Sequence, residues 1–219
     1  MTVVQQIKQS AKAGVCVVQT PNALSNLFVP DCAAAIWERQ PLPSFQFWLD
    51  NLDPQHLPSA RLILRATAVQ NAMRHRFRLS GAPDCPERAI LIDDIAALAD
   101  IFASLMDTAY LHLRLHVIST DACHTLHEDA VTARLICTYR GTGTQYGVSS
   151  NVGDPDYVHT VPTCAPIVLR GADWPTRPRT ILRYRSPSIE GTGETRLVLM
   201  LDPVADPEGT RQIQSMTRH

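Results

Sequence analysis

Hydrophobic and polar positions follow different periods in the two halves of the chain. In the first half, apolar side chains recur three to four residues apart, which is typical of amphipathic helices. Residues 43–52 begin at a proline and carry an aromatic face, residues 59–77 end before Gly81, and a longer helix follows Asp84-Cys85-Pro86. The pattern therefore predicts a mainly helical N-terminal region over residues 1–108.

In the second half the period is two, which is typical of half-buried strands. Residues 111–118 alternate cleanly, with leucine and valine on one face and histidine and arginine on the other, and residues 131–139, 165–169, 180–184 and 195–201 are further expected strands. Glycine and proline clusters separate them. We predict an α+β protein in which the helical N-terminal half packs on a C-terminal antiparallel double-stranded β-helix, or jelly roll, over residues 109–205, in one compact domain.

Composition excludes several classes of function. The 219 residues carry a net charge of -1, so no overall field attracts nucleic acid or an anionic membrane. No apolar run approaches the roughly 20 residues of a transmembrane helix, and the N-terminus lacks the apolar core of a secretory signal, so we expect a cytoplasmic protein. None of the six cysteines forms a C-x-x-C pair, and we expect small buried thiols, with Cys123 as the exception because it lies four residues before His127.

The candidate chemistry begins with the His-x-Asp pair His127 and Asp129. On a strand, residues i and i+2 project from the same face, and one imidazole with one carboxylate can supply two thirds of a facial metal-binding triad. The competing interpretation is a hydrogen-bonded polar pair at a strand end.

Two sequence blocks carry a family resemblance. C-H-T-L-H-E-D-A-V-T-A-R-L-I-C-T-Y-R-G-T-G-T-Q-Y and I-L-R-Y-R-S-P-S-I-E-G-T-G-E-T-R-L-V-L-M-L-D resemble the uncharacterised bacterial family known as domain of unknown function 1826, and A-I-W-E-R-Q-P-L near the N-terminus is a weaker third match. The order of the blocks is also similar to that of jelly-roll iron dioxygenases of the 2-oxoglutarate group. This resemblance implies a metal site with a third ligand, normally a histidine, on a late strand.

The chain departs from the family at that third ligand. The late motif usually reads His-Arg-Ser-Pro, and here residues 184–187 read Tyr-Arg-Ser-Pro. Three interpretations stay open: the Tyr184 phenolate binds ferric rather than ferrous iron or zinc, His159 or His124 supplies the missing imidazole, or the site is degenerate. Iron, as Fe(II) or Fe(III), is the expected metal, with zinc as the alternative.

An anionic cosubstrate is the second implication of the resemblance. In 2-oxoglutarate dioxygenases a basic residue after the distal histidine holds a carboxylate of the cosubstrate, and Arg196 lies twelve residues after Tyr184. Arg134 is the alternative anion clamp, and an ion pair between Arg196 and Glu194 is the competing interpretation. The functional hypotheses are a non-haem iron oxygenase acting on a small molecule, a non-catalytic metal-binding protein for zinc handling, and an interaction module that kept the fold; whether the chain is an enzyme stays open.

Overall fold

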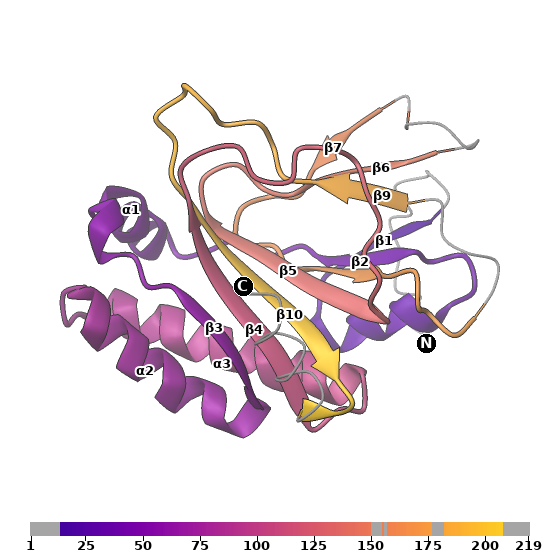
Figure 1. The fold of residues 1–219 in the computed structure, drawn as a ribbon, viewed down its shortest axis with the longest axis horizontal. Coiled ribbons are helices and arrows are strands. Elements are labelled where there is room, and N and C mark those ends of the chain that lie inside the picture. Colours follow the sequence, from indigo (N-terminus) through magenta and orange to yellow (C-terminus); the bar gives the residue numbers. More distant parts are fainter. Residues whose placement is uncertain (1–13, 150–154, 156, 177–181, 208–219) are drawn as a thin grey trace, which may run out of the picture.

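The architecture is taken from a computed structural model that describes residues 14–149, 155, 157–176 and 182–207. It combines helices with two β-sheets (Figure 1). The α-helices are α1 (Pro43–Asn51), α2 (Val69–Ser80) and α3 (Pro86–Leu105), and short 3-10 helices cover Pro21–Phe28, Pro54–His56 and Ala66–Ala68. The strands are β1 (Val15–Val18), β2 (Ala34–Trp37), β3 (Ala60–Arg65), β4 (Tyr110–Ile118), β5 (Ala133–Arg140), β6 (Gln145–Val148), β7 (His159–Thr160), β8 (Ile167–Arg170), β9 (Leu182–Arg185) and β10 (Arg196–Val204).

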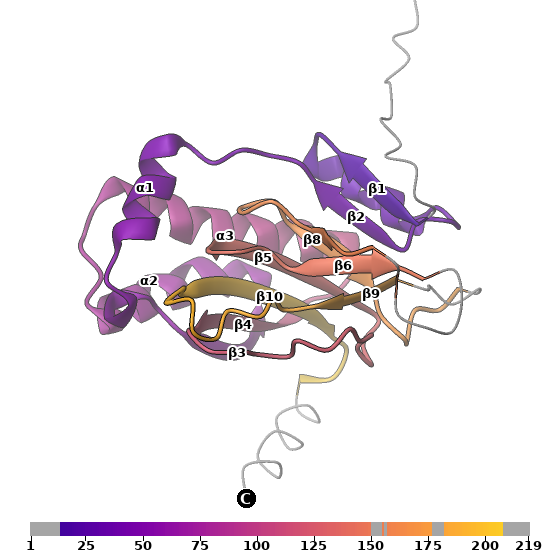
Figure 2. The same cartoon turned by 90° about the horizontal axis from the view of Figure 1, so that it is seen from above.

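Seven strands form the larger sheet, in the order β1-β2-β8-β5-β10-β4-β3, and β7-β6-β9 form the smaller one. β10 lies in the middle of the larger sheet, antiparallel to both β4 and β5. Side chains alternate across it: Leu197, Leu199 and Leu201 pack in the core cluster that includes α2 and α3, whereas Val198 and Met200 pack with Leu182 and other residues of the smaller sheet. Figure 2 shows α3 on one side of β5 and β8, with β6 and β9 on the other.

The prediction of helices and strands is confirmed for most long elements. α1, α3, β4, β5, β8 and β10 lie where the pattern places them, and α2 ends at Gly81, which adopts a left-handed conformation with φ 73°. The expected strand over residues 180–184 corresponds to β9, although residues 180 and 181 lie outside the described part of the chain.

The expected division into a helical N-terminal half and a stranded C-terminal half needs correction. β1, β2 and β3 all come from the first 108 residues and join the larger sheet, where β2 pairs with β8 and β3 pairs with β4. Residues 60–65 were included in the predicted helix 59–77 and instead form the edge strand β3. Pairing with β4 overrides the helical preference of this alanine- and arginine-containing segment.

Candidate functional site

His127 lies in the irregular segment between β4 and β5, ahead of the strand as expected, but without the regular strand geometry that the i, i+2 argument assumed. It forms an isolated antiparallel bridge with Tyr184 of β9, and each residue's backbone N–H donates to the other's carbonyl at 3.0 Å. Residues directly opposite in such a bridge present their side chains on one face. The two rings are accordingly 4.7 Å apart between centroids and inclined by 44°.

The tautomer of His127 follows from its hydrogen bonds. Nδ1 lies 2.8 Å from the carbonyl oxygen of Thr125, which can only accept, so Nδ1 carries the proton of the neutral ring and Nε2 keeps a free lone pair. Nε2 lies 3.9 Å from Oδ1 of Asp129. Cys123 Sγ is 3.6 Å from Nδ1, on the other edge of the ring, so it cannot share with Asp129 an ion bound at Nε2.

Asp129 is fixed from two directions. Its Oδ2 accepts a hydrogen bond from Nη1 of Arg134, and its backbone carbonyl accepts from Ala172 N at 2.9 Å. Gly171 makes this close approach possible, because a Cβ there would overlap the carbonyl oxygen of Val131 and lie 2.9 Å from that of Asp129. The loop after β8 therefore positions the carboxylate.

Arg134 of β5 connects this pair to the end of β10. Its Nε and Nη2 donate to the two oxygens of Asp202 at 2.6 and 3.0 Å, and Nη1 also donates to the Tyr184 hydroxyl at 3.0 Å. Asp202 receives a further bond from Arg114 at 2.5 Å. Burial opposes the charge of Arg134, but the hydrogen bonds and charges of Asp202 and Asp129 outweigh it and raise the pKa.

The His127–Asp129 pair fits two positions of a mononuclear metal site. Nε2 and Oδ1 face each other, Nδ1 is held by a backbone carbonyl, and Oδ2 is held by Arg134, which is the support that metal-binding histidines and carboxylates usually have. Among the described residues, no group of three or more histidine, cysteine, aspartate or glutamate side chains could hold a metal ion. Tyr184 is therefore the candidate for the third protein ligand within this part of the chain.

Among the described residues, neither alternative imidazole forms a metal-binding group with His127 and Asp129. His159 is exposed on β7, where its ring stacks on Tyr146 at 5.5 Å, and β6 and β9 lie between it and His127. At about 4.8 Å per strand this separation is roughly 14 Å. His124 is exposed and its Nδ1 faces the carbonyl of Ala122 at 3.3 Å.

Arg196 begins β10 and is only 1% exposed. Its Nε donates to the carbonyl of Thr142 at 2.6 Å, whereas Nη1 and Nη2 have no hydrogen-bond partner among the described residues. Glu194 does not accept a hydrogen bond from this guanidinium. Its two carboxylate oxygens accept instead from the backbone N–H and the hydroxyl of Thr142, at 2.6 and 2.9 Å. Burial lowers the pKa of Arg196 to about 10, partly offset by the charge of Glu194.

Arg196 and the partners of Arg134 lie along one face of β10, which we call its inner face because Val198 and Met200 on it pack with residues of the smaller sheet. Arg196, Val198, Met200 and Asp202 alternate on this face, with Arg196 at one end and Asp202, bound to Arg134, at the other. Asp202 was not among the residues predicted from the sequence; its signal is a carboxylate six residues after Arg196, on the same face of an otherwise apolar strand. Nor was Thr138, opposite Val198 on β5, whose buried hydroxyl has no partner in the described structure.

Within the described residues, no helix is both long enough and apolar enough to cross a membrane.

Solved structures of other proteins have a similar architecture. The structure is similar to the dioxygenase for auxin oxidation from rice, with a TM-score of 0.51 and 11% identity over 90% of this chain and 84% of that one. It is also similar to dioxygenase for auxin oxidation 1 from Arabidopsis thaliana in its complex with 2-oxoglutarate, with a TM-score of 0.52 and 9% identity over 90% and 94% of the two chains. At these identities the likeness concerns the fold: this is a mixed helix and sheet protein with neighbours among the dioxygenases.

No curated protein matches the sequence. The model of one family does, from residue 18 to residue 202, and it spans both sheets, the His127–Asp129 pair and Arg196. The chain thus belongs to the family described as protein of unknown function (DUF1826).

Proposed function

We propose that this protein binds a single metal ion at His127 and Asp129 and a dicarboxylate of the 2-oxoglutarate class at Arg196, as a non-haem iron oxygenase does. The observation that carries the proposal is the guanidinium of Arg196, which is buried and has two nitrogens without a partner among the described residues. A buried charge without a partner is costly, and a bidentate carboxylate satisfies such a fork. The similar Arabidopsis enzyme is a complex with 2-oxoglutarate, which supports this choice of ligand.

Arg196 has the geometry and charge for this role. The bond from Nε to the Thr142 carbonyl orients the side chain and leaves Nη1 and Nη2 open. With a pKa of about 10 the guanidinium remains charged at neutral pH. Thr138, on the neighbouring strand, offers a hydroxyl that could donate to the same carboxylate.

The other end of the inner face would hold the metal. His127 would bind through Nε2 and Asp129 through Oδ1, while Thr125 and Arg134 keep the two ligands oriented. Tyr184 would complete the protein ligands by giving up the hydroxyl proton, and Arg134 already donates to that oxygen. An iron ion bound there would supply the binding and activation of dioxygen.

The identity of residue 184 favours a second candidate, a non-catalytic protein that binds metal, such as zinc, or acts as an interaction module. A phenol has an ordinary pKa near 10 and is a poor ligand for divalent metals at neutral pH. With no third imidazole or carboxylate among the described residues, the pair would hold a metal weakly.

Calorimetric titration with 2-oxoglutarate in the presence of Mn(II), which resembles Fe(II) but is less prone to oxidation, tests the proposal. We expect saturable binding by the wild type, loss of this binding in Arg196→Ala, and retention in Arg185→Gln, which removes a charge from β9. Failure of the wild type to bind, or equal binding by Arg196→Ala, would contradict the proposal. Formation of succinate with Fe(II) and dioxygen separates the oxygenase from the non-catalytic candidate.

Substitution at position 184 tests the metal half separately. Tyr184→His places a neutral imidazole beside His127 and should strengthen binding of Fe(II) and Zn(II) at least tenfold, because imidazole needs no deprotonation at neutral pH. Elemental analysis of protein purified without a metal-chelating tag gives the starting occupancy. Equal affinity in the two proteins would mean that residue 184 does not face the metal.

A further inference from the structure

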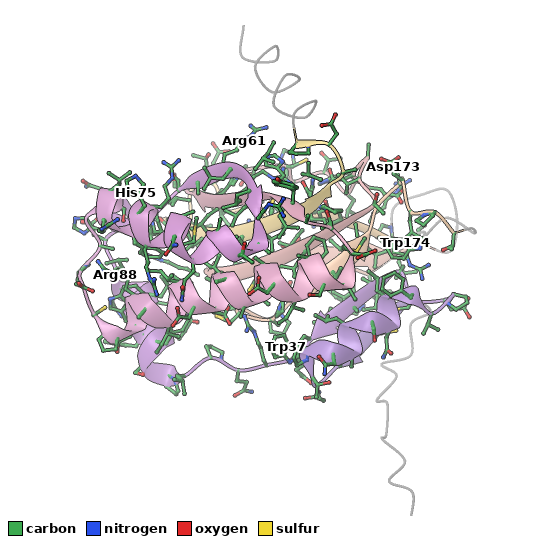
Figure 3. The ribbon with its side chains drawn as sticks, turned by 90° about the horizontal axis from the view of Figure 1, so that it is seen from below. Trp37, Arg61, His75, Arg88, Asp173 and Trp174 are labelled. Atoms are coloured by element: carbon green, nitrogen blue, oxygen red, sulfur yellow. The ribbon has the colours of Figure 1, made fainter. Side chains whose placement is uncertain are left out.

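A cluster of basic side chains borders the site on the face of β3 and β4 that is turned away from the helices. We call it the basic face; it consists of Arg61 of β3 and His112, Arg114 and His116 of β4. These β4 residues alternate with leucines that pack in the core with the helices, so they point to the opposite side of the sheet. Arg61 and His116 are exposed. In Figure 3, Arg61 lies along the same margin of the molecule as Asp173, and Trp37 lies toward the opposite one.

Two arginines stand directly opposite each other on this face. The register pairs Arg61 with Arg114. Like charges in directly opposite positions of an antiparallel pair destabilise it, since the two Cβ atoms are about 5 Å apart. Arg61 has no carboxylate partner among the described residues, and the carboxylate that reaches Arg114, Asp202, is shared with Arg134.

The groups around this pair respond to its uncompensated charge. Burial, followed by the charge of Arg114, lowers the pKa of His112 to about 4, and burial with the charges of Arg114 and Arg61 lowers the pKa of His116. Nε of Arg114 is buried without a hydrogen-bond partner in the described structure. Positive charge therefore exceeds negative charge here, and one guanidinium donor is unused.

We propose that the basic face binds the anionic group, a carboxylate or phosphate, of a small-molecule substrate. Two guanidinium groups on adjacent strands can each donate to one anion, and arginine forks match the planar geometry of carboxylate and phosphate oxygens. The anion would reduce the repulsion between Arg61 and Arg114, which among the described residues only Asp202 offsets, from the side of Arg114.

The basic face lies close to the candidate metal site, so an anion bound there is placed as part of a substrate rather than as a ligand of a separate site. Arg114 and Arg134 bind the same carboxylate, Asp202, and Arg134 binds Asp129. One aspartate and one arginine thus separate Arg114 from the candidate metal ligand. Calling the bound anion a substrate rests on the proposed function; its binding at Arg61 and Arg114 does not.

Phosphate and acetate titrations followed by NMR provide the test. We expect saturable shifts of the His112 and His116 ring signals, with the stronger response identifying the preferred anion. Arg61→Gln with Arg114→Gln should weaken anion binding at least tenfold. Arg74→Gln with Arg78→Gln removes the same charge from α2 and should leave binding unchanged. The single change Arg61→Gln, at an exposed position, should weaken binding severalfold and keeps the test valid if the double variant does not fold.

The outcome separates this inference from the proposed function. Binding of 2-oxoglutarate at Arg196 should persist in the Arg61 and Arg114 variant, and anion binding at the basic face should persist in Arg196→Ala. Unchanged anion affinity in the Arg61 and Arg114 variant, or an equal loss in the Arg74 and Arg78 variant, would overturn the inference. If the wild type binds phosphate or acetate at the basic face but does not bind 2-oxoglutarate, the result counts against the proposed function and leaves this inference standing.

Discussion

Arg134 and Arg196 are both buried, on neighbouring strands of the larger sheet, yet their surroundings differ. Arg134 has an acceptor at every nitrogen: Asp202 twice, Asp129 and the Tyr184 hydroxyl. In the part of the chain that the structure describes, Arg196 has one acceptor, a backbone carbonyl, and two nitrogens without a partner. Proteins rarely bury an unpaired charge. We therefore interpret Arg134 as a residue that orients the site and Arg196 as the residue that binds an anion.

The largest expected effect comes from removing each charge. Arg134→Met leaves Asp129 without its guanidinium and Asp202 with one partner fewer, and should lower the free energy of unfolding by about 3 kcal/mol or more. Arg196→Met removes a charge without a carboxylate and should leave stability unchanged or raise it by up to about 2 kcal/mol. Urea unfolding of the two variants measures the difference. Equal losses would show that the two arginines contribute alike and would contradict the assignment of Arg196 as an unpaired charge.

This contrast could be predicted only in part from sequence. Both arginines were candidates for an anion clamp, Arg196 because it follows the position of the family's distal histidine and Arg134 because it lies on the strand after Asp129. Which of them is satisfied depends on Asp202, which approaches Arg134 because β5 and β10 are neighbours in the sheet. Strand order is a tertiary property, and no local pattern in the chain states it.

The convergence of His127 and Asp129 illustrates the same limit. Their i, i+2 spacing predicted that the side chains would approach each other, and Nε2 and Oδ1 do face each other at 3.9 Å. The regular strand assumed for them is absent, and the approach depends instead on the bridge to Tyr184 and on the loop at Gly171. Similarly, β3 was predicted as helix because pairing with β4 has no signal within the segment itself.

Acid should lower the stability of the fold through His112, which lies opposite Asp202, the carboxylate partner of Arg134. Burial and the charge of Arg114 lower the pKa of His112 from 6.5 to about 4. The unfolded chain then binds a proton near pH 6.5 and the folded chain only near pH 4, so the stability that His112 contributes above pH 6.5 is lost as the pH falls toward 4. At about 1.4 kcal/mol per pKa unit, the loss is at most about 3 kcal/mol.

Unfolding of His112→Gln at a series of pH values checks this. Its stability should fall less than that of the wild type between pH 7 and pH 4, whereas His75→Gln, at an exposed position on α2, should follow the wild type. Parallel curves for all three proteins would mean that His112 titrates normally in the fold.

Substitutions at two glycines should disturb the candidate metal site and the Arg196 site separately, with similar losses of stability. A Cβ on Gly171 would overlap the carbonyl of Val131 beside Asp129, and a Cβ on Gly143 would overlap the carbonyl of Val161 next to the Thr142 turn that holds Arg196. Each Gly→Ala change should lower stability by about 1–3 kcal/mol through overpacking. Gly171→Ala should weaken metal binding, and Gly143→Ala should weaken 2-oxoglutarate binding. Titrations of both ligands against both variants measure this, and matching losses of both ligands in both variants would show that the two sites are not independent.

The smallest expected effect concerns Thr138, the buried hydroxyl opposite Val198. Thr138→Val replaces an unpartnered polar group by an apolar one of nearly the same shape, so the free protein should gain up to about 1 kcal/mol, because an unsatisfied buried hydroxyl is costly. If the hydroxyl donates to a carboxylate held by Arg196, 2-oxoglutarate binding should weaken severalfold while metal binding stays constant. Ser149→Ala, another buried hydroxyl change, serves as the control for affinity. A more stable variant with weaker 2-oxoglutarate binding would show that this hydroxyl is kept for the ligand rather than for the fold, whereas a less stable variant with unchanged affinity would assign Thr138 to the core.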